Sequence, residues 1–139
     1  MTDARPKALV VEDEAATRAL LCQWLDDIDF DVDLAVDGEE ALAQLRARDY
    51  DVVLLDIVLP RMSGIEVMES LQRERPGTLG CIIVVTGLDI REIRSLFPAV
   101  HETLSKPVLP RRLREAVRSC VAKPRGGDSE GVDERITPG

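Results

Sequence analysis

Short apolar runs alternate along this chain with longer stretches in which apolar residues recur at every third or fourth position. The short runs are rich in Val, Ile and Leu and predict buried β-strands. They lie at residues 7–11, 51–57 and 81–87, with a shorter and weaker run at 101–105. Residues 30–36 alternate apolar and acidic side chains, which is typical of a half-covered edge strand. The pattern therefore predicts five strands.

The stretches between these strands predict helices, because each places its apolar residues on one face. The first helix begins at Ala15 and carries apolar side chains at residues 16, 20, 21, 24, 25 and 28. Each of the next three begins with a capping pair, in which an Asp or Ser is followed three residues later by Glu. These pairs are Asp37 with Glu40, Ser63 with Glu66, and Asp89 with Glu92. The last helix begins near residue 110.

After residue 122 the composition changes, because apolar residues become few and helix-breaking Gly and Pro frequent. We therefore expect one folded domain over residues 1–122 and a disordered tail over 123–139. Strands that alternate with helices predict a parallel sheet covered on both faces, since each crossover connection packs back onto the sheet.

Polar residues follow four of the predicted strands, at the edge of the sheet where such folds bind ligands. They are Glu12 and Asp13, Asp56, Thr86 and Lys106. Because the carboxyl ends of parallel strands share one edge, we expect these side chains to form a single site.

The net charge of −8 argues against nucleic acid as a partner, because proteins bind nucleic acid by neutralising its phosphates with Lys and Arg. The acidic excess lies in residues 1–60, which carry 15 acidic and 5 basic side chains and would attract cations. The three cysteines lack metal-site spacing, so we interpret them as reduced thiols. With no apolar stretch of membrane-spanning length and no signal peptide, we expect a cytoplasmic protein without membrane contact.

Clustered carboxylates repel one another, so an ionised cluster at neutral pH requires a cation. Mg²⁺ suits Asp13, Asp56 and a backbone carbonyl just beyond Asp56, because it prefers oxygen ligands and keeps several waters. Lys106 and the Thr86 hydroxyl would face this metal and supply the charge and the donor that a phosphoryl group needs in transfer. Asp56 is then either a ligand only or also a nucleophile that accepts the phosphoryl group.

Taken together, four motifs resemble the receiver domain of two-component response regulators over about residues 5–122: Glu12-Asp13, "DIVLPRMSG" around Asp56, "TG" at Thr86 and "KP" at Lys106. The resemblance implies a flavodoxin-like, doubly wound sheet of five parallel strands in the order 2-1-3-4-5, with five helices. It also implies a phosphoacceptor that assists its own phosphorylation and dephosphorylation rather than a classical enzyme.

The resemblance assigns a role to each site residue. Asp56 would accept a phosphoryl group from a histidine kinase or histidine phosphotransfer protein. Mg²⁺ would be bound by Asp13, Asp56 and the backbone carbonyl of Val58, with Glu12 acting mainly through water. Thr86 and Lys106 would contact the phosphoryl oxygens, and the Lys106–Pro107 bond would be cis. Phosphorylation would alter binding of a target protein or a second copy at the face of the fourth helix, fifth strand and fifth helix.

Two features depart from the family pattern. Receivers usually carry Tyr or Phe three residues before the lysine, where this chain has Thr103, and a small side chain cannot swing with Thr86 as an aromatic ring does. The segment between Thr86 and Lys106 is also shorter than usual, which predicts an altered or shortened fourth helix and an unusual output face. Val58 and Leu88 are apolar where receivers tune hydrolysis, so we expect the phosphoryl group to be lost no faster than is typical.

The leading interpretation is a receiver that acts alone, as a phosphate relay, a phosphate sink or a binder of a target protein. A second interpretation is a receiver-like scaffold whose binding does not depend on phosphate. A hydrolase of the haloacid dehalogenase type fits less well, because Val58 stands where that motif has a second Asp. The basic residues of the fourth and last helices form either a solvated face or a docking surface for an acidic partner: Arg91, Arg94, Arg111, Arg112, Arg114 and Arg118.

Overall fold

Five parallel strands form the centre of the structure, in the order β2-β1-β3-β4-β5. The computed structural model describes residues 5–122, so the tail predicted at 123–139 and the first four residues lie outside the described residues. The strands are β1 (Lys7–Val11), β2 (Asp31–Ala35), β3 (Val52–Leu55), β4 (Ile82–Thr86) and β5 (Glu102–Ser105). The predicted sheet class and strand order are confirmed, and β2 is an edge strand as its alternation indicated.

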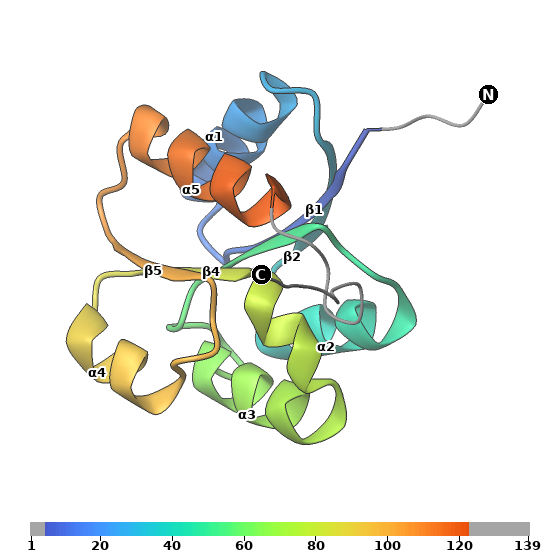
Figure 1. Ribbon diagram of the computed structural model, residues 1–139, viewed down its shortest axis with the longest axis vertical. Coiled ribbons are helices and arrows are strands. Elements are labelled where there is room, and N and C mark those ends of the chain that lie inside the picture. Colours follow the sequence, from blue (N-terminus) through green and yellow to red (C-terminus); the bar gives the residue numbers. More distant parts are fainter. Residues whose placement is uncertain (1–4, 123–139) are drawn as a thin grey trace, which may run out of the picture.

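The helices cover both faces of the sheet (Figure 1). On one face lie α1 (Ala15–Asp26) and α5 (Pro110–Ala122). On the other lie α2 (Gly38–Ala47), α3 (Gly64–Glu74) and α4 (Ile90–Leu96). The five predicted α-helices are therefore present in the described part of the chain, and α4 is the shortest of them at seven residues.

A short 3-10 helix, η1 (Pro76–Cys81), was not predicted from the sequence. It has no apolar periodicity, because two of its six residues are Gly and its first is Pro. Cys81, expected to begin the fourth strand, belongs to η1 instead, and β4 begins one residue later.

The core consists of two apolar clusters, one on each face of the sheet. Successive strand residues point to opposite faces, so Leu9 packs under α2 and α3 while its neighbours Ala8 and Val10 pack under α1 and α5. Both faces of β1, β3 and β4 are buried, which explains why these strands read as continuous apolar runs rather than as alternating ones.

The apolar face predicted for α1 is narrower than expected. Leu21 and Leu25 are buried, but Leu20 is 49% exposed and Ala16 is also exposed. Leu20 instead lines a surface cavity together with Trp24 and Lys106.

Within the described residues, no helix is both long and apolar enough to span a membrane.

The three predicted capping pairs differ in detail. Ser63 and Glu66 form the full reciprocal capping box of α3. Asp37 accepts a hydrogen bond from the Glu40 N–H, but the Glu40 carboxylate accepts from the N–H of Val36 rather than from that of Asp37. At α4 the Asp89 side chain accepts from the Arg91 N–H, so Glu92 takes no part in a capping box.

Candidate functional site

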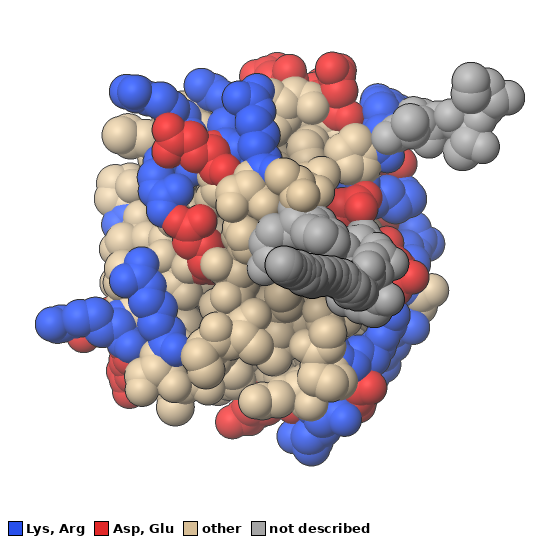
Figure 2. Space-filling view, viewed as in Figure 1, with Lys and Arg blue, Asp and Glu red and all other residues tan. Residues whose placement is uncertain are grey.

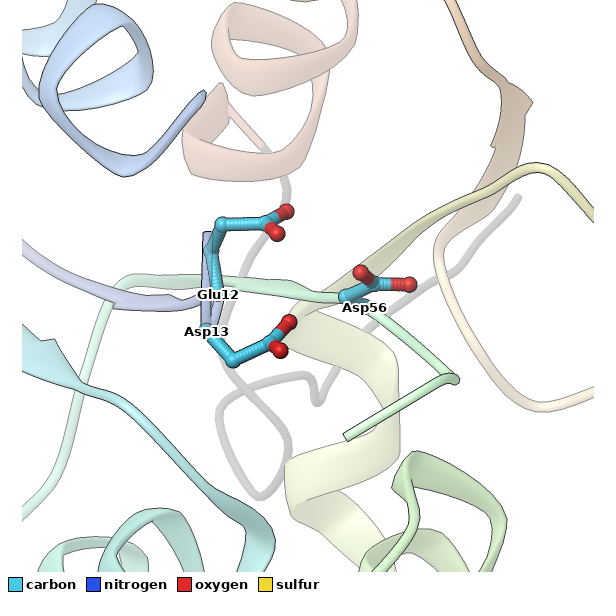
Figure 3. A group of neighbouring side chains, drawn as sticks. All are labelled: Glu12, Asp13 and Asp56. Carbon is cyan, nitrogen blue, oxygen red and sulfur yellow. The ribbon is translucent and has the colours of Figure 1, made fainter. Parts of the chain in front are cut away.

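Three carboxylates meet at the carboxyl edge of the sheet. Glu12 and Asp13 follow β1, and Asp56 follows β3, the neighbouring strand. One ligand oxygen from each of the three lies within 4.8 Å of the others, and Figure 3 shows Glu12 and Asp13 extending toward Asp56 at the end of the neighbouring strand. The structure thus brings these three sequence-predicted residues together.

Backbone hydrogen bonds hold this cluster in register with the sheet. The Glu12 N–H donates to the Ala35 carbonyl at 3.1 Å, and the Asp56 N–H donates to the Val11 carbonyl at 3.1 Å. Both acids therefore lie just beyond the ends of their strands, where backbone hydrogen bonds to the neighbouring strand still fix their position.

Lys106 completes the cluster from the end of β5. Its Nζ donates to Glu12 Oε1 at 3.1 Å and to Asp56 Oδ2 at 3.0 Å. Its backbone N–H donates to the Thr86 carbonyl at 2.8 Å, which ties the lysine to the end of β4. The Lys106–Pro107 peptide is cis, as the resemblance implied.

Burial differs sharply among the three acids. Glu12 is 2% exposed and Asp56 is also buried, whereas Asp13 is exposed. Desolvation raises the pKa of Glu12, and the hydrogen bond from Lys106 opposes this effect without cancelling it. Burial also lowers the pKa of Lys106, but its hydrogen bonds to Asp56 and Glu12 outweigh burial and leave that pKa raised. Lys106 is therefore firmly cationic.

The loop after β3 turns back over Asp56. The Val58 N–H donates to Asp56 Oδ1 at 3.2 Å, and the Gly64 N–H donates to the Ile57 carbonyl at 2.8 Å. A Cβ at Gly64 would lie 2.5 Å from the Asp56 carbonyl oxygen, so only glycine permits this approach of α3 to the strand end. The Val58 side chain itself points to solvent.

Thr86 ends β4 and is fully buried. Its hydroxyl oxygen accepts a hydrogen bond from the Leu88 N–H at 3.1 Å. A hydroxyl that accepts in this way retains its own proton for donation. The structure thus places Thr86 next to Lys106 through the backbone, with its side chain turned toward the loop after β4.

Arg18 on α1 was not identified from the sequence. Its guanidinium donates to the carbonyl oxygens of Glu12 and Asp13, at 2.9 Å and 3.3 Å. This positive charge fixes the backbone that carries the two acids. The only sequence signal was an arginine at the fourth position of a helix that begins directly after an acidic cluster.

Thr103 lies on β5 opposite Val84 of β4. It is 1% exposed, and its hydroxyl oxygen has no hydrogen-bond partner among the described residues 5–122. Arg94 of α4 donates to the Thr103 carbonyl at 3.3 Å. The position that departs from the family pattern is therefore fully buried between α4 and the sheet.

The donor set fits a hard divalent cation. Three carboxylates offset by one lysine leave an excess of two negative charges when all are ionised, and the nearby groups are oxygen ligands of the kind Mg²⁺ prefers. Because Asp13 is exposed while Glu12 and Asp56 are buried, a cation could bind from the solvent side and keep part of its water shell.

Comparison with known proteins gives a consistent result. A family model described as response regulator receiver domain matches residues 8–118. The chain is 33% identical over 135 residues to the transcriptional regulatory protein TcrA of Mycobacterium tuberculosis, covering 95% of this chain and 53% of TcrA. It is 34% identical over 114 residues to the Regulator of RpoS of Escherichia coli, covering 81% of this chain and 34% of that protein. The chain thus spans about half, or less, of the length of these relatives.

Solved structures resemble the chain over most of its length. A CheY-like response regulator receiver domain protein from Methanospirillum hungatei is 30% identical, with a TM-score of 0.76, and the match covers 85% of this chain and 94% of that one. The response regulator TrrA from Thermotoga maritima, solved in complex with Mg(2+)-BeF, is 31% identical, with a TM-score of 0.74 and coverage of 83% and 98%.

Proposed function

The chain belongs to the response regulator receiver family, and from this premise we propose that it accepts a phosphoryl group on Asp56 in a reaction assisted by Mg²⁺. The observation that carries the proposal is the position of the Asp56 carboxylate, which lies 3.0 Å from the Lys106 ammonium and beside two further carboxylates. This set provides a nucleophilic oxygen, a fixed positive charge and a ligand cluster for a cation.

The reaction is a transfer between two nucleophiles. An Asp56 carboxylate oxygen attacks the phosphorus of a phosphohistidine, the P–N bond breaks, and the imidazole nitrogen of the donor leaves with the bonding electron pair and takes up a proton. The product is an acyl phosphate on Asp56. The phosphoryl oxygens gain negative charge during this step, so the site must stabilise that charge.

Lys106 and Thr86 are proposed to contact those oxygens. Lys106 holds Asp56 and Glu12 in the structure, so its ammonium is already directed at the reacting carboxylate. Thr86 would have to leave the Leu88 N–H and turn its hydroxyl toward the phosphoryl group. Mg²⁺ would be bound by Asp13, Asp56 and the Val58 carbonyl, with Glu12 acting through water, and when bound it would neutralise charge on the phosphoryl oxygens.

A protein donor fits the surface around the site. Large apolar side chains are exposed near it, from α1 and from the loops that follow β3, β4 and β5: Leu20, Val58, Leu88 and Leu109. A charged site bordered by exposed apolar residues is typical of an interaction surface. This arrangement supports a histidine kinase or histidine phosphotransfer protein as the donor. We expect self-assisted loss of the phosphoryl group to be no faster than is typical, because the apolar side chains of Val58 and Leu88 cannot orient water.

The output is proposed to lie at the face formed by α4, β5 and α5. Figure 2 shows Lys and Arg side chains over α5 and near α4, on the side of the molecule where these elements lie. The basic residues of the two helices support an acidic partner or a second copy of this chain, whose first sixty residues are strongly acidic.

Intact-mass spectrometry after incubation with acetyl phosphate and Mg²⁺ tests the proposal. We expect the unaltered chain to gain the mass of one phosphoryl group, and the Asp56→Asn variant to gain none. Asp49→Asn is the matched control, because Asp49 is exposed, pairs with Arg75 and lies far from the site. An adduct that persists in Asp56→Asn would place the reaction elsewhere.

A second candidate is a scaffold whose partner binding does not depend on phosphate. Thr103 favours it, because a small side chain cannot report the position of Thr86 as an aromatic ring does. Equal partner binding with and without acetyl phosphate, in a chain that does form the adduct, would support this alternative.

A further inference from the structure

The loop that carries Val58 is anchored at a second place, away from the carboxylate cluster. Arg61 in this loop donates a hydrogen bond through Nε to Asp37 Oδ2 at 2.9 Å, and its Nη2 forms an ion pair with the same oxygen at 2.8 Å. Asp37 is the N-cap of α2, and its other oxygen accepts from the Glu40 N–H at 2.7 Å. Both oxygens of one carboxylate are therefore occupied, one by a helix and one by the loop.

The environment of Asp37 makes this pair more than a surface contact. Its side chain is only 11% exposed. Hydrogen bonds from the Glu40 backbone and from Arg61 hold the pKa of Asp37 below its ordinary value. By contrast, the Arg46–Glu74 pair between α2 and α3 joins two well-exposed side chains. Most exposed pairs contribute little to stability or rigidity. Here the Arg61 side chain is 58% exposed, but the buried carboxylate of Asp37, fixed by the α2 N-terminus, can hold its partner in place.

The loop backbone also lies directly on the first residue of α2. A Cβ at Gly38 would be only 1.8 Å from the Met62 carbonyl oxygen, so no other residue fits beneath the loop. Between these contacts Arg61 has φ of 66°, a left-handed conformation that costs free energy for a residue with a Cβ. Such a conformation persists only where the surroundings fix it. Here the Met62 N–H donates to the Pro60 carbonyl at 2.7 Å across Arg61, and the Asp37 and Gly38 contacts hold the loop on either side.

We propose that Asp37 and Arg61 form a clamp that positions the metal-binding loop, and so couples the N-terminus of α2 to the affinity of the site for Mg²⁺. Arg61 is three residues beyond Val58, whose N–H is already bonded to Asp56. Fixing Arg61 therefore restricts the backbone between Asp56 and Arg61, which includes the Val58 carbonyl. A restricted carbonyl is better placed as a ligand, because Mg²⁺ requires nearly ideal octahedral geometry. The inference rests on the proposed function, because it assumes Mg²⁺ at the carboxylate cluster.

The test measures binding of Mg²⁺ alone to the full, unphosphorylated chain by isothermal titration calorimetry. Arg61→Asn removes the ion pair but tolerates a positive φ, so the backbone is not strained further. We expect its Mg²⁺ Kd to rise about tenfold, the lower end of the range for residues that orient metal ligands. Asp37→Asn keeps the N-cap acceptor and should give a similar rise. Arg61→Lys, which restores the charge, should recover part of the affinity.

A double-mutant comparison separates positioning from general stability. If the clamp acts as one unit, Arg61→Asn combined with Asp37→Asn should bind Mg²⁺ no more weakly than either single variant. Arg46→Gln is the matched control, because it removes an arginine–carboxylate pair of α2 that lies away from the loop, and its Kd should be unchanged. Equal Kd values in the unaltered chain and all clamp variants would overturn the clamp alone. Absence of Mg²⁺ binding by the unaltered chain would overturn the clamp and the proposed metal together.

Discussion

Lys106 forms ion pairs with both Glu12 and Asp56, so removing its charge has a specific consequence. Lys106→Met keeps the apolar stem of the side chain and removes the ammonium. Two buried carboxylates, about 3 Å from the missing charge, are then left to repel each other. We expect the variant to fold but to be less stable than the unaltered chain at neutral pH.

The magnitude follows from burial. Breaking a buried pair by removing one partner typically costs about 3–5 kcal/mol. The Lys106 side chain is 30% exposed, so water screens part of the interaction, and we expect a loss of about 2–3 kcal/mol in the free energy of unfolding. Adding Glu12→Gln should restore about 1 kcal/mol or more, because it removes one of the two repelling charges.

The pH dependence has a definite sign. The pKa of Glu12 is raised in the folded state, so the folded protein gains stability as pH falls through that pKa and loses it as pH rises. Without Lys106 the pKa of Glu12 rises further, so the deficit of Lys106→Met should shrink between neutral pH and about pH 5. The pKa of Lys106 is also raised, so its own stabilising effect is complete below its unfolded pKa and is lost only in alkali.

Urea unfolding followed by circular dichroism, at both pH values and with and without Mg²⁺, measures these effects. Mg²⁺ should stabilise Lys106→Met more than the unaltered chain, because it replaces the missing positive charge. A deficit that is the same at both pH values, or a variant as stable as the unaltered chain, would refute the reasoning.

Three further changes have expected outcomes. Gly64→Ala should lower the free energy of unfolding, measured with urea, by about 3 kcal/mol, because its Cβ would lie 2.5 Å from the Asp56 carbonyl oxygen. Gly77→Ala is the control, because a Cβ there meets nothing within 4 Å. Thr103→Val should raise the free energy of unfolding by about 1 kcal/mol, since it removes a buried hydroxyl without a partner in the described part of the chain, and a loss of stability would contradict this. Leu88→Glu should speed loss of the phosphoryl adduct in time-resolved intact-mass spectrometry, because a carboxylate can orient water; an unchanged rate would show that this position does not control hydrolysis.

The architecture could be predicted because its signals are local and agree with one another. Buried parallel strands such as β4 consist of continuous apolar residues, and the Ser63–Glu66 box fixes the beginning of α3. Turns without periodicity, such as η1, give no such signal. The Asp37–Arg61 pair joins positions far apart in the chain and depends on the path of a loop, so no spacing rule predicts it. The same is true of Arg18, whose role depends on where its side chain reaches.

The pair Glu12 and Asp13 shows why a motif does not determine the roles of its members. The two acids are adjacent and chemically similar, and both carboxylates reach the same cluster as Asp56. Even so, Glu12 is buried against Lys106, while Asp13 is exposed to solvent. In the proposed metal site, a cation that arrived with its water shell would meet Asp13 first, whereas Glu12 already forms an ion pair with Lys106. The difference in burial thus supports Asp13 as the proposed direct ligand, a distinction that arises from the fold and not from the residue types.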